Sequence, residues 1–148
     1  MLQEPIQILL ADDDDDDRLF FKEAFEEIKI KTHVRFVNDG VELMNHLNQN
    51  GNQLPHILFL DLNMPRKSGI ECLLEIKRMN QLQNIAIAIY STSSSDLDIE
   101  ETFVKGANVY IKKPSDFATL KRILEKVIKV NWQYQTSGLN RANYLISL

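Results

Sequence analysis

The sequence predicts one α/β domain in which parallel strands alternate with helices in a doubly wound sandwich. Short, wholly apolar segments recur along the chain, and such segments are typical of strands that are buried on both faces of a parallel sheet. Between them lie longer segments with apolar residues at helical spacing, as expected of helices that cover the sheet. At 148 residues, of which 44% are hydrophobic, the chain is long enough for a single domain with an ordinary core.

The first expected elements follow one another near the start of the chain. Residues Ile6 to Ala11 form a continuous apolar run, which predicts a strand. Apolar residues at helical spacing then predict a helix from about Asp16 to Ile30, opened by Asp16 or Asp17. Alternating apolar residues from Val34 to Phe36 predict the second strand.

The next two helices are expected to begin at capping boxes, in which a short polar side chain and an acidic residue three positions later bond to each other's backbone. Asp39 and Glu42 form the first box, and Ser68 and Glu71 form the second. Between these two boxes, Ile57 to Leu60 is a short apolar run that predicts the third strand.

The same alternation continues in the second half of the chain. Residues Ile85 to Tyr90 predict the fourth strand, and Ser94 or Ser95 can cap the helix that follows. Gly106 is expected to end that helix. The residues expected on its inner face are Leu97, Thr102 and Val104.

The last unit completes a set of five. Residues Val109 to Lys112 predict the fifth strand, and an apolar stripe from Phe117 to Ile128 predicts the last helix. Right-handed crossovers allow few strand orders for such a chain, and the flavodoxin-like order 2-1-3-4-5 is the common one. Ligands in these sheets bind beyond the carboxyl ends of the strands, near strands one and three. The polar residues expected at that edge are Asp12, Asp13, Asp61, Ser91 and Lys113.

The six aspartates from Asp12 to Asp17 allow other interpretations. Blocks of like charge are usually solvated, and aspartate is a good helix cap. Four acidic residues also match positions 1, 3, 5 and 12 of an EF-hand loop, namely Asp12, Asp14, Asp16 and Glu23. That match fails, because Asp17 occupies the position that needs glycine and a strand precedes the run. We expect Asp12 and Asp13 to serve a site, and Asp14 to Asp17 mostly to form a loop and a helix start.

The residues at the expected edge suit phosphoryl chemistry at a divalent cation. Carboxylates gathered at one place raise one another's pKa unless a cation compensates them. Mg²⁺ suits such a site, with Mn²⁺ as an alternative, because it takes oxygen ligands and shares them with phosphoryl groups. Lys113 can offer a positive charge to a phosphoryl group and Ser91 a hydroxyl. Asp61 is the best candidate for a nucleophile that forms an acyl phosphate.

Composition excludes several other classes of protein. The net charge of -4 and the lack of a basic patch argue against a nucleic-acid-binding surface. The lone cysteine, Cys72, rules out an internal disulfide and suits a reducing compartment. No apolar stretch approaches membrane-spanning length, and no basic region followed by an apolar one opens the chain. We therefore expect a soluble, cytoplasmic protein that binds neither nucleic acid nor membranes.

From Ile6 to about Val130 the chain resembles the receiver domain of bacterial response regulators, also called CheY-like. The resemblance rests on several motifs in order: Asp12-Asp13, the stretch Asp61 to Pro65 with Gly69 beyond it, Ser91, and Lys113-Pro114. It implies that a sensor histidine kinase or a phosphotransfer protein passes a phosphoryl group to Asp61. The domain would then switch its contacts with a downstream protein target.

The resemblance also assigns roles to the other site residues. It implies that Asp13 and Asp61 bind Mg²⁺ directly, that Asp12 does so directly or through water, and that Asn63 contributes its backbone carbonyl. Lys113 would contact the phosphoryl group, and its bond to Pro114 would be cis.

A conformational switch is implied as well. Ser91 would move to the phosphoryl oxygen, Tyr110 would turn into the vacated space, and the face of helix four, strand five and helix five would change. Ser91 stands where threonine is more usual, and Thr92 is bulkier than the small residue often found there. We hypothesise that Thr92 and Ser93 hinder water and slow loss of the phosphoryl group.

The expected organisation is a receiver domain over residues 1–130 and a tail over residues 131–148, without an output domain. The tail is either packed on its own domain or a contact with a partner or a second copy, since it carries aromatic residues such as Trp132 and Tyr144. We expect a single-domain response regulator rather than a turnover enzyme, and stand-alone receivers of this kind also resemble partners of phytochrome-like kinases. The alternatives are a haloacid-dehalogenase-type phosphohydrolase, which needs a second aspartate where this chain has Asn63, and an unphosphorylated docking module.

Overall fold

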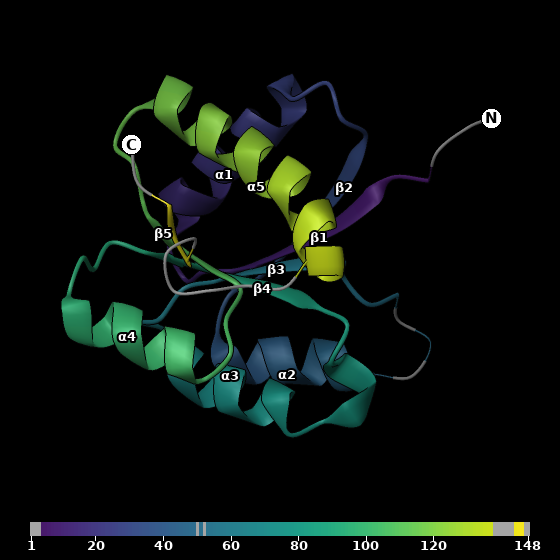
Figure 1. Ribbon diagram of the computed structural model, residues 1–148, viewed down its shortest axis with the longest axis vertical. Coiled ribbons are helices and arrows are strands. Elements are labelled where there is room, and N and C mark those ends of the chain that lie inside the picture. Colours follow the sequence, from purple (N-terminus) through teal and green to yellow (C-terminus); the bar gives the residue numbers. More distant parts are fainter. Residues whose placement is uncertain (1–3, 50, 52, 138–143, 147–148) are drawn as a thin grey trace.

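The computed structural model describes residues 4–49, 51, 53–137 and 144–146. One sheet lies between two layers of helices (Figure 1). Helices α1 (Asp15–Glu27) and α5 (Phe117–Ser137) cover one face of the sheet; α2 (Gly40–Asn48), α3 (Gly69–Lys77) and α4 (Asp96–Val104) cover the other. This arrangement confirms the predicted doubly wound α/β class. No helix in the described part of the chain is both long and apolar enough to cross a membrane.

The sheet contains the five predicted strands in the predicted order. They are β1 (Ile6–Ala11), β2 (Thr32–Val37), β3 (Ile57–Leu60), β4 (Ala86–Ser91) and β5 (Val109–Lys112). The sheet order is β2-β1-β3-β4-β5-β6, where β6 (Leu145–Ile146) is a two-residue strand that the sequence did not predict. Each neighbouring pair is parallel. All strands therefore present their carboxyl ends at the same edge.

The register aligns the strand ends that matter for chemistry. Ala11 pairs with Leu60, so that the residues after β1 and β3 leave the sheet side by side. Ser91 likewise pairs with Lys112 at the ends of β4 and β5. The acidic residues after β1 and β3 thus lie on the same edge as the hydroxyl and the lysine of β4 and β5.

Local capping fixes where the helices begin. Ser68 and Glu71 form the predicted capping box of α3, and Ser95 caps α4 as predicted. Helix α1 differs from the prediction: Asp14, rather than Asp16 or Asp17, is its N-cap and accepts a hydrogen bond from the backbone of Asp17. An N-cap residue has an extended backbone while its side chain accepts from the first turn, and the backbone of Asp14 is extended.

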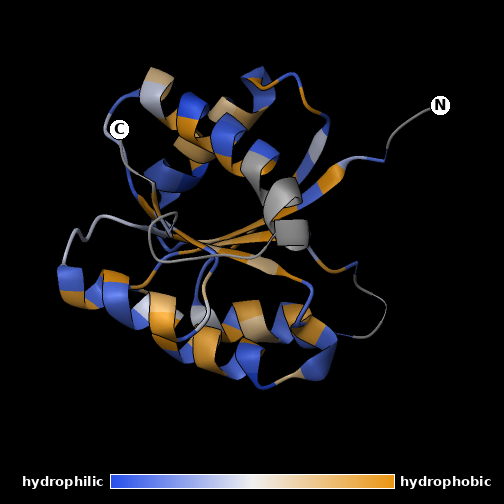
Figure 2. Ribbon diagram, viewed as in Figure 1, coloured by the Kyte–Doolittle hydropathy of each residue, from blue (hydrophilic) through white to orange (hydrophobic). Residues whose placement is uncertain are grey.

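The apolar strands form two cores, one on each face of the sheet. Alternate residues of β1 face opposite sides, as the two-residue period of a strand requires: Ile8 and Leu10 pack under α1 and α5, whereas Leu9 packs toward α2 and α3. Figure 2 shows the apolar strands between helices whose outward residues are largely hydrophilic. Aromatic side chains cluster in the first core, with Phe21 centred 5.0 Å from Phe59 and 5.6 Å from Tyr90.

The orientation of α4 corrects one prediction. Leu97 and Val104, expected on its inner face, are 75% and 71% exposed. Thr102 is buried as predicted, and Ile99, which was not predicted to face inward, is buried as well. Each residue turns an α-helix by about 100°, so Leu97 and Val104, seven positions apart, lie on the same face. A second apolar stripe can lie on a neighbouring face of the same helix. The sequence of α4 offers two such stripes, and packing against the sheet selects the one that contains Ile99.

Residues 144–146 pack against α4 and β5. The ring of Tyr144 is fully buried, 5.2 Å from Phe103 and 6.2 Å from Tyr110 between ring centres. Its hydroxyl donates a 2.6 Å hydrogen bond to Oγ1 of Thr102. Leu145 then pairs with Tyr110 as β6 continues along β5. The remaining aromatic residues of the tail, such as Trp132 and Tyr134, have side chains outside the described residues.

Replacing Tyr144 with alanine is expected to lower the free energy of unfolding by about 1 to 3 kcal/mol, because it removes a buried ring and leaves Thr102 without its donor. Leu145→Ala is the matched control: its side chain is 41% exposed, so a change within about 0.5 kcal/mol is expected. Urea denaturation measures both. Equal, small effects would mean that β6 does not dock in solution.

Candidate functional site

Three carboxylates meet beyond the carboxyl ends of β1 and β3. Ligand oxygens of Asp12, Asp13 and Asp61 all lie within 4.8 Å of one another. Asp12 is fully buried and Asp61 is 6% exposed, whereas Asp13 faces solvent. The strand register delivers Asp12 and Asp61 to this position, because each directly follows a strand that pairs with the other. The cluster is therefore half enclosed and open on the side of Asp13.

Lys113 provides the positive charge nearest to these carboxylates. Its Nζ lies 2.8 Å from Oδ2 of Asp12 and 3.5 Å from Oδ2 of Asp61. The backbone N–H of Lys113 donates to the carbonyl of Ser91 at 2.8 Å, so the end of β4 holds the lysine in place. The ammonium also lies 5.3 Å from the centre of the Tyr90 ring, within the range of a cation–π contact.

Asp17 belongs to this cluster as well, although its position in the sequence predicts only a helix start. Its Oδ2 lies 2.8 Å from Nζ of Lys113, as close as that of Asp12. Helix α1 begins at the same edge of the sheet, and Asp17 lies in its first turn. The sequence could have indicated this role, because a helix that begins just after a strand ends keeps the side chains of its first turn near that edge of the sheet.

Two of the remaining aspartates of the run, Asp14 and Asp15, have structural partners. Asp14 caps α1, and Asp15 forms an ion pair with Arg18. Arg18 also donates through Nη1 to the carbonyl of Asp12 at 2.7 Å. Asp16 is exposed. The run thus separates into site residues and residues that fix the loop.

Burial raises the proton affinity of the enclosed carboxylates. It raises the pKa of Asp61 to about 6; nearby Lys113 opposes this shift and Asp12 adds to it. Burial likewise raises the pKa of Asp12, against the effect of Lys113. Burial alone would lower the pKa of Lys113, but the carboxylates of Asp12 and Asp17, each 2.8 Å from its Nζ, outweigh burial and raise it. Lys113 is therefore charged at any physiological pH.

The loop after β3 is held tightly around Asp61. The backbone N–H of Asn63 points to Oδ1 of Asp61 at 3.4 Å, and that of Gly69 donates to the carbonyl of Leu62 at 3.0 Å. A Cβ atom at Gly69 would lie 2.2 Å from the carbonyl oxygen of Asp61. Only glycine allows the start of α3 to approach Asp61 this closely. Asn63 itself is exposed.

The residues after β4 form a second, hydroxyl-rich group. Ser91 is buried, and its Oγ accepts a hydrogen bond from the backbone of Ser93 at 3.1 Å. Tyr110 is fully buried, and its hydroxyl donates to the carbonyl of Ser93 at 2.9 Å. Thr92 is exposed. The ring of Tyr110 is thus turned inward, toward the loop that carries Ser91.

The expectation of a cis bond before Pro114 is wrong. No peptide bond in the described residues is cis, and Lys113 and Pro114 are both among them. The trans form of a bond to proline is intrinsically favoured by roughly 0.5 to 1 kcal/mol. The loop into α5 accommodates that form here.

The donor set fits a hard divalent cation. The carboxylates of Asp12, Asp17 and Asp61 lie around the ammonium of Lys113, and that of Asp13 joins Asp12 and Asp61 in the cluster. The buried Oδ2 of Asp12 receives no well-aligned hydrogen bond from the described residues. Oxygen ligands with an excess of negative charge are what Mg²⁺ and similar cations require. A divalent cation would offset the excess.

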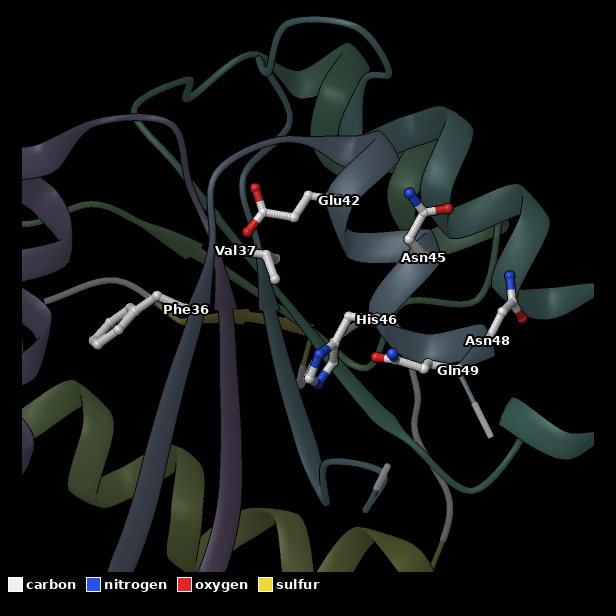
Figure 3. A pocket seen from close by; sticks show the side chains of 7 residues that line it. All are labelled: Phe36, Val37, Glu42, Asn45, His46, Asn48 and Gln49. Atoms are coloured by element: carbon white, nitrogen blue, oxygen red, sulfur yellow. The ribbon is translucent and has the colours of Figure 1, made fainter. Parts of the chain in front are cut away.

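A hollow of about 460 Å³ elsewhere on the molecule does not share these residues. It lies between α2 and the end of β2 and is shown in Figure 3. Its lining consists of Phe36, Val37, Glu42, Asn45, His46, Asn48 and Gln49. No residue of the carboxylate cluster lines this hollow.

Comparison with known sequences identifies relatives of the whole domain. Residues 8–125 match the family described as the response regulator receiver domain. The chain is 32% identical to the probable methanogenesis regulatory protein FilR2 of Methanothrix harundinacea, over 88% of this chain and 85% of that protein. It is 28% identical to the response regulator Rcp1 of Synechocystis sp., over 83% of this chain and 86% of that protein.

Solved structures of response regulators are also similar to this chain. The phosphorylated cyanobacterial phytochrome response regulator RcpA is 29% identical, with a TM-score of 0.79, and the match covers 92% of this chain and 98% of that one. The Mn²⁺-bound form of Rcp1 is 26% identical, with a TM-score of 0.76 and the same coverage. The likeness therefore extends over nearly the whole chain.

The raised pKa of Asp61 predicts a pH-dependent effect of Asp61→Asn in metal-free buffer. The carboxyl group of Asp61 binds its proton more tightly in the folded chain than in the unfolded chain. Ionisation of Asp61 therefore lowers the free energy of unfolding, fully above about pH 6 and less as the pH falls below that value. Asp61→Asn should raise the free energy of unfolding at pH 7.5 by at most about 3 kcal/mol, and by less at pH 5. Urea denaturation in EDTA measures this. An increase that is equal at both pH values would contradict it.

Proposed function

The chain belongs to the response regulator receiver domain family, and from this premise we propose that it is a single-domain response regulator whose phosphoacceptor is Asp61. Receiver domains are signalling modules of two-component phosphorelays rather than turnover enzymes. FilR2 and Rcp1 extend little beyond the matched region, which supports the single-domain part of the proposal. The observation that carries it is the cluster of Asp12, Asp13 and Asp61 beside Lys113.

The proposed reaction is transfer of a phosphoryl group from a phosphohistidine to Asp61. A carboxylate oxygen of Asp61 forms a bond to phosphorus, while the bond from phosphorus to the donor's nitrogen breaks and the nitrogen keeps the electron pair. With a pKa of about 6, Asp61 is mainly ionised at neutral pH and can act as the nucleophile. Lys113, 3.5 Å from Asp61, would stabilise the charge on the transferred group.

Mg²⁺ is the proposed cofactor, and Mn²⁺ an alternative. Asp13, Asp61 and the backbone carbonyl of Asn63 would hold the cation, with Asp12 bound directly or through water. When bound, the cation would offset the charges of the carboxylates and of the phosphoryl oxygens. The Mn²⁺-bound structure of Rcp1 supports a divalent cation in a similar domain.

We further propose that Ser91 and Tyr110 transmit the change. Ser91 would move to the phosphoryl group, Thr92 would border it, and Tyr110, which is already turned inward here, would move further into the space left by Ser91. The added group carries roughly 1.5 to 2 negative charges and strong acceptors, which can bias an element with two arrangements. The proposed partner surface is the face of α4, β5 and α5, where Leu97 and Val104 are exposed.

The proposed donor is a sensor histidine kinase or a phosphotransfer protein, and the proposed recipient of the signal is a downstream protein target. RcpA and Rcp1 point to kinases of the phytochrome type, since RcpA is described as a phytochrome response regulator. The proposal includes a cytoplasmic location, which the single buried cysteine Cys72 suits. A homodimer through residues 131–148 is also proposed, excluding residues 144–146, which pack on their own domain. Loss of dimer mass in light scattering after removal of residues 131–148 would support it.

The other candidate functions are less well supported. A haloacid-dehalogenase-type phosphohydrolase needs a second aspartate where this chain has Asn63. A docking module that is never phosphorylated would not need the enclosed carboxylates and Lys113. Neither candidate explains as many of the site residues.

Mass spectrometry after incubation with acetyl phosphate and Mg²⁺ tests the proposal. The chain is expected to gain one phosphoryl group, and Asp61→Asn is expected to gain none because the nucleophile is missing. Addition of EDTA should prevent the reaction of the native chain. Continuous release of phosphate from phosphate esters would instead indicate a hydrolase, and no reaction at all would favour the docking module.

Loss of the phosphoryl group should be faster in Thr92→Ala, because we propose that Thr92 and Ser93 hinder the approach of water. An increase of less than about tenfold is expected, since removing a few atoms at an exposed position changes the barrier by less than about 1.4 kcal/mol. Ser94→Ala, two residues further along the same exposed loop, is the control and should leave the rate unchanged. If Thr92→Ala decays at the native rate, the hypothesis fails.

A further inference from the structure

Asp17 is not needed for the phosphoryl chemistry proposed for Asp61, yet its carboxylate contacts the lysine on which that chemistry depends. Nζ of Lys113 lies 2.8 Å from Asp17 and from Asp12, but 3.5 Å from Asp61. The ammonium is therefore held by two carboxylates that are not the phosphoacceptor. This arrangement raises the question of which contact Lys113 gives up when Asp61 is modified.

The position of Asp17 does not depend on Lys113. Its backbone N–H donates to Oδ1 of Asp14 at 3.0 Å, within the cap that begins α1. An acidic side chain in the first turn of a helix is also favoured by the helix dipole. The fold thus presents this carboxylate to the lysine from a rigid element.

The two carboxylates that hold Lys113 differ in their access to water. The side chain of Asp12 is fully buried, whereas that of Asp17 is 36% exposed. A buried carboxylate that loses its cation is left uncompensated, which is costly, but a partly exposed one can be solvated. When a phosphoryl oxygen on Asp61 attracts Lys113, the contact with Asp17 is the one that can be given up at the smaller cost.

We propose that Asp17 is a positioning residue that holds Lys113 before phosphorylation and competes with the phosphoryl group for it afterwards. This inference rests on the proposed function of Asp61. Asp17 would lower the stability of the phosphorylated form and, with Asp12, keep the lysine from pairing closely with the free nucleophile. The fourth carboxylate of the cluster is therefore part of the switch rather than part of the loop.

The experiment uses beryllofluoride, which mimics a phosphoryl group on a carboxylate, at saturating Mg²⁺ with the whole chain. Asp17→Asn should bind it about three- to fivefold more tightly than the native chain, because a competing ion pair of a partly exposed group has been removed. Asp16→Asn is the matched control. It removes the same charge from the same helix turn, but Asp16 is exposed and its neighbour Asp17 makes the contact with Lys113.

A conservative substitution of Asp17 distinguishes a role in positioning Lys113 from a general role in stabilising the fold. Asp17→Glu keeps the charge and should bind beryllofluoride with nearly native affinity, and urea denaturation should show that all variants are folded. Equal affinities of Asp17→Asn and Asp16→Asn would overturn the proposal, as would an Asp17→Glu variant that behaves like Asp17→Asn. If the native chain binds no beryllofluoride, the proposed function of Asp61 fails instead, so the two failures can be told apart.

Discussion

The contact between the ammonium of Lys113 and the carboxylates around it is the interaction on which the rest of the site depends. Asp12 is fully buried, and a carboxylate in that position without a cation would be strongly destabilising. Lys113 reaches it only because β5 lies beside β4, whose final carbonyl binds the lysine's backbone. The charge balance of the site is therefore set by the order and register of the strands.

This dependence links the apolar core to the chemistry. Strands β1, β3 and β4 are buried at every position, so a shift in register would draw a flanking polar residue, such as Asp12 after β1, into the core. The cost of such a shift fixes the ends of β1 and β3, and with them the separation of Asp12 and Asp61. Gly69 adds a local constraint, since the backbone of Asp61 leaves no room there for a side chain.

Much of this could be predicted from the sequence, because apolar runs locate strands and the residue after each run locates the edge. Asp12, Asp61 and Lys113 were found in this way. Asp17 was missed because its role depends on where α1 begins, which the aspartate run itself obscures. On α4 the prediction for Thr102 was right, but those for Leu97 and Val104 were wrong, because Leu97 and Ile99 belong to two competing stripes. The bond before Pro114 was also wrong, since a small intrinsic preference is decided by the surrounding loop.

The pairing of β6 with β5 has a consequence for how the molecule behaves among other proteins. An open strand edge exposes unpaired N–H and C=O groups and can recruit strands from neighbouring chains into aggregates. At one end of this sheet the outermost strand is only two residues long. At the other end, β2 carries exposed His33 and Arg35. Short length on one side and polar side chains on the other protect both borders of the sheet from uncontrolled self-association.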